Sequence, residues 1–170
     1  MTKILVPSWG WVYLHVVLDW ASKKIVGYDV TLRSKTGDWL CALQRAVNQQ
    51  FPHGIRETTE LNLVSDNGGQ PTSVGFMREC RALGIQQIFT SYDNPKGNAD
   101  TERVIRTLKE DLIRPREWLS VGQLETAVAW WIRQYNSDYP HSAINYQTPE
   151  QFEASFQPQP STAKTLQIAA

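Results

Sequence analysis

The spacing of apolar residues changes near Lys35, and this change limits the folds that the chain can adopt. Before Lys35, three runs rich in β-branched and aromatic residues predict strands at 2–6, 11–18 and 24–32. After it, apolar residues recur at helical spacing, with short strand-like runs between the helical segments. These later elements are predicted as helix 35–51, strand 61–65, helix 71–83, strand 85–90, helices 98–112 and 122–135, and a last helical turn opening at 148–150.

This order of elements predicts an α/β fold. Three sequential strands followed by alternating helices and strands favour a five-stranded mixed sheet, with its first three strands antiparallel and helices on both faces. A length of 170 residues fits one domain, which we place at residues 1–156. Residues 157–170 have little to bury, so we expect a flexible C-terminal tail there. No stretch reaches the roughly 18 apolar residues that span a bilayer, and we expect no membrane association.

Charge and cysteine content exclude some classes of protein. The 17 basic and 17 acidic residues balance, which argues against nucleic-acid binding through bulk electrostatics but leaves room for a local basic face. The two cysteines, Cys41 and Cys80, have no Cys or His at metal-ligand spacing and suggest no disulfide framework. A reducing, cytoplasmic setting is the simplest expectation.

Two carboxylates are placed where chemistry is expected. Asp66 ends the predicted strand 61–65 and precedes Asn-Gly-Gly, and the carboxyl edge of a strand is where α/β sheets bind ligands. Glu102 lies in the first turns of the helix predicted at 98–112. The 35 residues between them contain one helix and one strand, enough for a crossover that returns the chain beside its start. Such a pair suits Mg²⁺, although spacing alone favours a turn former and an exposed helix residue.

A series of motifs surrounds these carboxylates. They are Tyr13-Leu14 through Asp19, Ser22 through Gly27, Val64 through Gly68, Phe89-Thr90-Ser91, Asn94 through Asn98, Leu108-Lys109, Tyr135-Asn136, Pro140-His141, Tyr146 and Thr148 through Phe152. Together with the interval of 35 residues, they resemble the catalytic core of bacterial insertion-sequence transposases and retroviral integrases. The resemblance covers residues 2–156.

This resemblance implies an RNase H-like fold and an Asp, Asp, Glu triad that holds two Mg²⁺ or Mn²⁺ ions, cuts DNA 3′ ends and joins them to a target. Asp66 matches the second acid and Glu102 the third, so both are expected catalytic residues and metal ligands. In the family, the first acid stands two residues before a Thr on the first strand. That Thr is Thr2 here, so the position falls immediately before Met1. We therefore expect this chain alone to be inactive.

Asp19 is the alternative candidate for the first acid. It ends the second strand and matches a family position outside the triad, so we expect it to cap the following turn together with Ser22. Asp29 is no better placed. The missing acid has two explanations: Met1 is an internal Met taken as the start of a shortened chain or gene, or the element is a decayed remnant. In either case we expect the first strand, central in this fold, to be shortened at its N-terminal end.

A basic face is predicted on the helix that carries Glu102. Arg106 and Lys109 lie one and two turns after Glu102 on the same side, and the resemblance implies that both contact DNA phosphates. Lys96 and Arg103 extend the predicted DNA-binding set, and Arg114 and Arg116 lie close in sequence. The alternative is an ordinary solvated helix face with an i,i+4 pair between Glu102 and Arg106.

Three functions remain open from the sequence. The first is an enzyme domain that is active only with the first Asp supplied by a longer chain. The second is a catalytically dead DNA-binding remnant, and the third is an assembly module that contributes only subunit contacts. The resemblance implies DNA, as transposon ends and target, and further copies of the same chain as partners.

Overall fold

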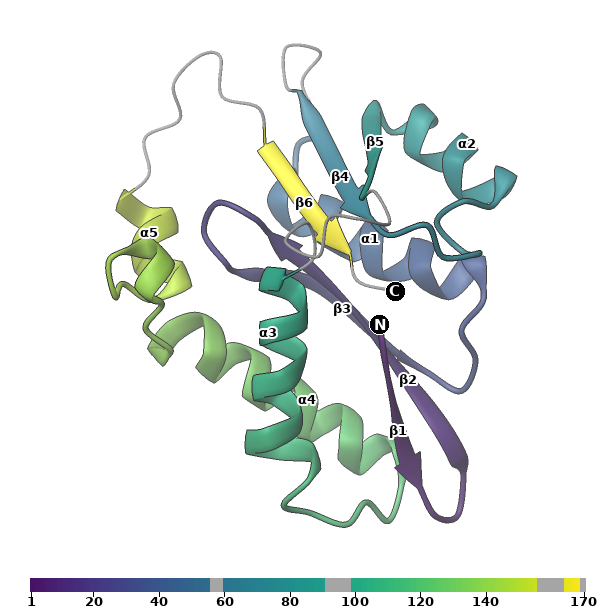
Figure 1. The fold of residues 1–170 in the computed structure, drawn as a ribbon. Coiled ribbons are helices and arrows are strands. Elements are labelled where there is room, and N and C mark those ends of the chain that lie inside the picture. Colours follow the sequence, from purple (N-terminus) through teal and green to yellow (C-terminus); the bar gives the residue numbers. More distant parts are fainter. Residues whose placement is uncertain (56–59, 91–98, 156–163, 169–170) are drawn as a thin grey trace.

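The computed structural model describes residues 1–55, 60–90, 99–155 and 164–168, and these form a mixed sheet with helices on both faces (Figure 1). The strands are β1 (Thr2–Val6), β2 (Gly10–Asp19), β3 (Ile25–Thr31), β4 (Leu61–Ser65), β5 (Ile85–Phe89) and β6 (Lys164–Ile168). The helices are α1 (Thr36–Gln50), α2 (Val74–Ala82), α3 (Ala99–Leu108), the π-helical turn η2 (Lys109–Ile113), α4 (Val121–Asp138), the 3-10 turn η3 (Ser142–Ile144) and α5 (Pro149–Ser155). The predicted order of elements and the α/β class are confirmed, and β6 is an additional strand.

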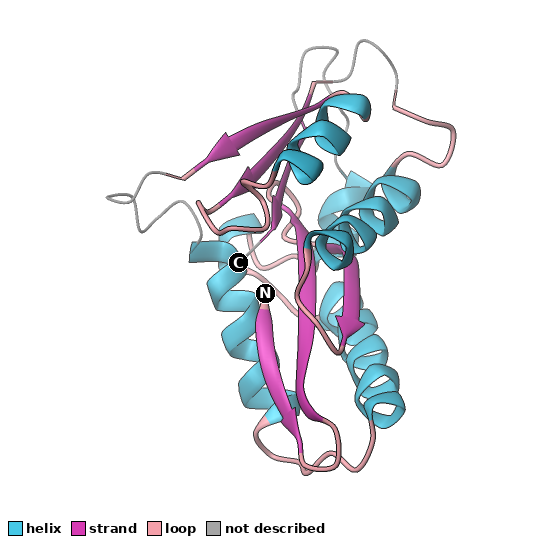
Figure 2. Ribbon diagram, turned by 90° about the vertical axis from the view of Figure 1, so that its right-hand side faces the viewer, coloured by secondary structure: helices cyan, strands magenta, loops and turns pink. Residues whose placement is uncertain are grey.

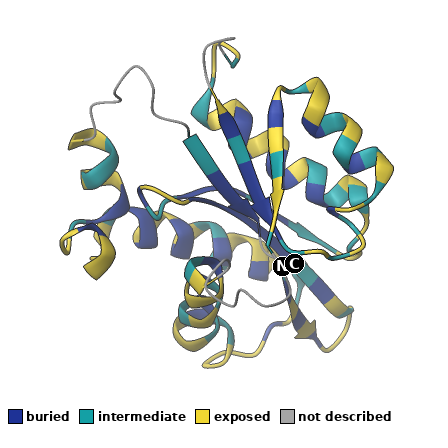
Figure 3. Cartoon of the chain, turned by 45° about the horizontal axis from the view of Figure 1, so that its top comes forward, coloured by how far each residue is buried: buried dark blue, intermediate teal, exposed yellow. Residues whose placement is uncertain are grey.

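The first three strands form an antiparallel meander around β2. β1 pairs with the first half of β2, and β3 pairs with its second half on the opposite edge. Side chains along β2 alternate between the two faces of the sheet, so Leu14, Val16 and Leu18 are buried on one face and Val17 on the other. From Leu14 onward β2 is buried on both faces, which explains why this part of the strand is almost continuously apolar (Figure 3).

One face of the sheet is covered by α1 and α2. α1 packs closely on β3 at Gly27, where an added Cβ would lie 2.5 Å from the Ala42 carbonyl oxygen and 2.7 Å from the Ala46 Cβ. The small residues at all three positions allow this approach. Helix α2 begins at Val74 rather than at residue 71 because Ser73 caps it, accepting a hydrogen bond from the backbone N–H of Phe76.

The other face is covered by α3, η2 and α4, so the sheet lies between two layers of helix (Figure 2). The apolar side chains of this second layer pack on the face that carries Leu14, Val16 and Leu18. Its buried helical members are Val104, Leu108, Leu112, Leu124, Val128, Trp131, Ile132 and Tyr135. In the part of the chain that the structure describes, no helix is long and apolar enough to cross a membrane.

The strand β6 comes from the segment in which the sequence predicted a flexible tail. It runs antiparallel to β2, with Ile168 opposite Val17, and parallel to β4, with Lys164 opposite Leu61. Leu166 and Ile168 are fully buried. The composition of residues 157–170 gave no sign of this strand, because its stability comes from two distant neighbours rather than from its own sequence.

Candidate active site

Asp66 follows the last residue of β4, at the carboxyl edge of the two parallel strands β4 and β5. Its Oδ1 accepts a hydrogen bond of 3.0 Å from the backbone N–H of Gly68. Asn67 donates from Nδ2 to the carbonyl oxygen of Thr90, at 2.9 Å, and so ties this turn to the end of β5. Asp66 therefore has the turn-forming role that the sequence offered as the alternative. This role engages Oδ1 and holds the half-buried carboxylate at the strand edge where ligands bind.

The N-terminal end of β1 lies near Asp66. The amino group of Met1 is buried, and burial lowers its pKa to about 5. The negative charge of Asp66 opposes this shift, and the positive charge of Lys109 adds to it. The start of β1 therefore lies near Asp66 at the end of β4 and near Lys109 at the start of η2.

Glu102 lies in the first turn of α3 and is exposed. The opposite side of the helix, at Thr101, Val104 and Leu108, is buried. Lys109 lies two turns after Glu102, on the same side, and its charge reaches the Met1 amino group. Glu102 therefore lies on the side of the helix that faces away from the buried core.

The described residues do not make a complete metal site. Among them, no group of three or more His, Cys, Asp or Glu side chains is placed to hold a metal ion. Asp66 and Glu102 offer carboxylate oxygens, the donors that Mg²⁺ prefers, but without a third acidic partner in this part of the chain. The three-carboxylate site implied by the resemblance does not fit the described residues alone.

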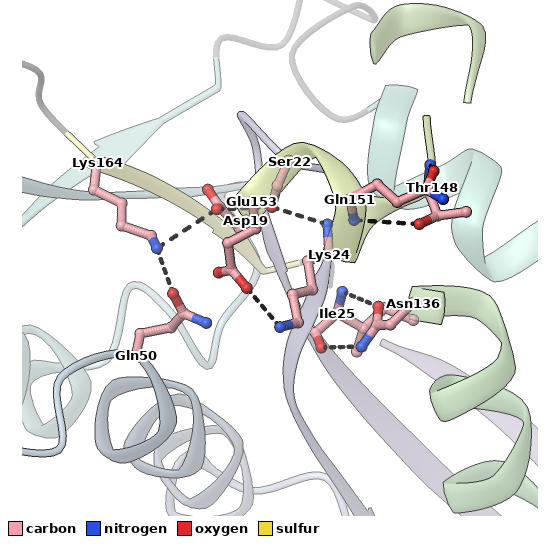
Figure 4. A network of polar contacts seen from close by, with 10 residues as sticks. All are labelled: Asp19, Ser22, Lys24, Ile25, Gln50, Asn136, Thr148, Gln151, Glu153 and Lys164. Atoms are coloured by element: carbon pink, nitrogen blue, oxygen red, sulfur yellow. Dashed lines mark hydrogen bonds and ion pairs between the residues drawn. The ribbon is translucent and has the colours of Figure 1, made fainter. Parts of the chain in front are cut away.

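Asp19 does not join this cluster. Its Oδ2 accepts a hydrogen bond of 2.8 Å from the Ser22 hydroxyl (Figure 4). Its Oδ1 accepts one from the backbone N–H of Ala21. Asp19 is almost completely buried, and its predicted role as the cap of the β2–β3 turn is confirmed. Asp29 is also structural, because it pairs with Arg45 at 2.7 Å.

A contact that the sequence did not predict anchors the helix that carries Glu102. The Oδ2 atom of Asp100 accepts hydrogen bonds from Trp20 Nε1, at 2.8 Å, and from Lys23 Nζ, at 2.7 Å. Both donors lie in the β2–β3 turn that Asp19 caps. These residues are about 80 positions from Asp100 in sequence, so no local pattern could reveal the contact. It fixes the first turn of α3 against the sheet.

The predicted DNA-binding residues lie in different environments. Arg103 and Arg106 are exposed and Lys109 is half-buried, whereas Lys96 lies outside the described residues. Arg103 contributes to lowering the pKa of His141, after burial and Lys23, so its positive charge lies near the segment that follows α4. No ion pair joins Glu102 to Arg106 among the residues described, which disfavours the simple i,i+4 pair.

Comparison with protein families gives two matches. Residues 1–95 match one sequence profile described as an integrase core domain, and residues 83–149 match a second profile with the same description. The first match covers more than half of the chain. It includes Asp66, and the second includes Glu102.

Two curated relatives are transposases. The chain is 31% identical over 148 residues to the transposase for insertion sequence element IS904 of Lactococcus lactis, covering 85% of this chain and 55% of that protein. It is 24% identical over 152 residues to the transposase for insertion sequence element IS629 of Shigella sonnei, covering 89% and 49%. The chain therefore spans about half the length of these two relatives.

Solved structures share the fold. The catalytic core domain of BIV integrase matches with a TM-score of 0.62 and 23% identity, covering 91% of this chain and 92% of that one. The HTLV-2 integrase catalytic core domain in complex with magnesium matches with a TM-score of 0.65 and 16% identity, covering 89% and 90%. At these identities the likeness establishes an integrase-type, RNase H-like architecture and no more.

Proposed function

Because this chain belongs to the integrase core domain family, we propose that it is the catalytic core of a DNA transposase, which cleaves DNA strands and transfers them in a divalent-metal-dependent manner. Asp66 and Glu102 are its catalytic carboxylates and metal ligands. Its partners are the DNA ends of an element, a target DNA and further copies of the same chain. We propose a reducing, cytoplasmic setting, in which Cys41 and Cys80 remain the free thiols that the structure describes.

The observation that supports this proposal is the position of the start of β1, near Asp66 at the end of β4 and near Lys109 at the start of η2. Asp66 is held at the end of β4 by its turn. The charges of Asp66 and Lys109 both shift the pKa of the Met1 amino group. Glu102 lies on the same side of its helix as Lys109. A carboxylate directly before Met1 would therefore enter the space beside Asp66.

The same geometry accounts for the expected inactivity of the 170-residue chain. Two carboxylates without the third leave a divalent cation with too few protein oxygens, and Mg²⁺ exchanges its waters reluctantly. We therefore expect weak metal binding and no strand cleavage from this chain, even with Mn²⁺.

The test is a plasmid-nicking assay on two proteins side by side, with Mg²⁺, with Mn²⁺ and with chelator. One protein is the 170-residue chain, and the other is extended at its N-terminus by a strand segment that ends in Asp directly before Met1. We expect metal-dependent nicking from the extended chain alone. If the 170-residue chain is active and Asp19→Asn abolishes that activity, Asp19 is the first acid, and its assignment to the position before Met1 is wrong. Inactivity of both proteins, with intact DNA binding, would favour the dead remnant.

A further inference from the structure

β1 and β6 lie on the same edge of β2, one behind the other. Leu14 of β2 pairs with β1 on one edge and β3 on the other, and Val17 pairs with β6 on one edge and β3 on the other. A strand can pair along only two edges, and β3 occupies one edge of β2. β1 and β6 therefore both pair along the other edge. Both run antiparallel to β2 and therefore point the same way (Figure 1).

β1 and β6 pair with neighbouring segments of β2. Thr2 is opposite Leu14, and Ile168 is opposite Val17, so only His15 and Val16 of β2 lie between the two pairs. Continuing the β1 register backwards puts the residue directly before Met1 opposite Val16. The residues before that one fall on the places held by Ile168, Gln167 and Leu166.

β6 fills a slot whose two walls are β2 and β4. The backbone of β6 pairs with both walls, which is the arrangement by which an added strand binds with little dependence on its sequence. Side-chain selection is limited to the three buried positions, Leu166, Gln167 and Ile168, and to the first residue. That residue, Lys164, contacts Gln50 and lies 3.6 Å from Asp19 (Figure 4).

We infer that this slot is a strand-acceptor site, that β6 is its replaceable occupant, and that an extended segment joined in front of Met1 displaces β6. Such a segment enters the slot as a continuation of β1 and has no loop to close. β6 enters only by closing the connection of residues 156–163, and the entropy cost of closing a loop grows with its length. When the two segments carry the same side chains, the segment joined to β1 therefore occupies the slot with the lower free energy. The inference rests on the proposed function only because the first carboxylate is expected on that segment.

The experiment adds six residues, Lys-Thr-Leu-Gln-Ile-Asp, in front of Met1. They copy Lys164–Ile168 in register and end in Asp. A matched control adds Lys-Thr-Pro-Gln-Pro-Asp, because proline lacks the N–H that a central strand must donate. Backbone hydrogen exchange is followed by mass spectrometry, which separates N-terminal from C-terminal peptides.

We expect residues 165–168 to be protected in the 170-residue chain and in the proline control. In the chain with the strand-forming extension, their protection should fall by about tenfold or more, and the extension should become protected. Residues 165–168 that stay fully protected beside an unprotected extension would overturn the inference.

Deletion of residues 164–170 tests the inference independently, through the melting temperature. It should lower the melting temperature of the 170-residue chain and leave that of the extended chain nearly unchanged. An equal loss in both would also overturn the inference. Neither readout involves metal or cleavage, so an extended chain that exchanges strands but fails to nick DNA would contradict the proposed function alone.

Discussion

At the scale of single residues, the side chain of Asn136 joins α4 to the start of β3. Its Oδ1 accepts from the backbone N–H of Ile25, and its Nδ2 donates to the carbonyl oxygen of the same residue, both at 2.9 Å (Figure 4). The contact is buried and closes a sequence separation of 111 residues. The Tyr135-Asn136 motif thus has a structural role that the sequence did not disclose.

Replacing Asn136 with Ala should destabilise the fold by roughly 2–4 kcal/mol, because a buried donor and a buried acceptor of Ile25 would both be left without a partner. Urea unfolding measures this directly. Gln134→Ala, on the exposed side of the same helix, is the control and should change stability by less than about 0.5 kcal/mol. A stability loss no larger than that of the control would show that water replaces the amide without cost.

His15 makes the stability of the fold depend on pH. It is fully buried on β2, with Nε2 3.3 Å from the Ser34 hydroxyl and its ring edge-on to Trp39. Burial lowers the pKa of His15 from 6.5 to about 4, and the Met1 amino group adds to this shift, whereas Asp38 and Asp29 oppose it. Between these two pKa values, the imidazole is neutral in the folded chain and charged in the unfolded chain.

The unfolded chain therefore binds more protons, and folding stability should fall as pH decreases from about 6.5 to 4. The component from His15 is about 3.5 kcal/mol at most, at roughly 1.4 kcal/mol per pKa unit. His15→Gln should remove it, so unfolding curves of the variant should depend less on pH in this window. His53→Gln, at an exposed site, is the control. Parallel pH profiles of the parent chain and His15→Gln would contradict this assignment.

At the scale of elements, α3 combines the candidate chemistry with the candidate DNA contacts. Its first turn is held by Asp100 against the β2–β3 turn, and its buried side packs on the sheet. The exposed side carries Glu102 and Arg106 and leads to Lys109. Sequence spacing was sufficient to predict this exposed side, because a single helix fixes it. The anchor of the helix was not predictable, because it depends on how distant elements meet.

Replacing both Arg106 and Lys109 with Ala should weaken binding to duplex DNA and lower the slope of log affinity against log salt by about two, because two phosphates would no longer be neutralised by the protein. A salt titration of binding gives both quantities. The control replaces Arg78 and Arg81 of α2, on the other side of the sheet, and should leave affinity nearly unchanged. Equal affinity and slope in the parent and the Arg106/Lys109 variant would exclude this face as the DNA site.

At the scale of the whole molecule, two apolar layers enclose one sheet, and the change of period near Lys35 was enough to predict this architecture. The alternation in β2 and the helical spacing in α1 each record a local geometry that the sequence must satisfy. β6 was missed because five residues with two buried apolar side chains carry little local signal. The positions of Asp66 after β4 and of Glu102 in the first turn of α3 were predictable from motif spacing, whereas the proximity of the start of β1 to Asp66 required the fold.

We propose above all that Asp66 and Glu102 belong to one catalytic centre, completed by an acid in front of Met1. The most direct measurement is the rate of Mn²⁺-dependent plasmid nicking by the N-terminally extended chain and its variants. Asp66→Asn and Glu102→Gln should each reduce the rate to the level seen with chelator. Glu110→Gln, on the turn after the helix, and Asp19→Asn, if it folds, should retain most of the activity. Retention of the full rate in either Asp66→Asn or Glu102→Gln would contradict a shared catalytic centre.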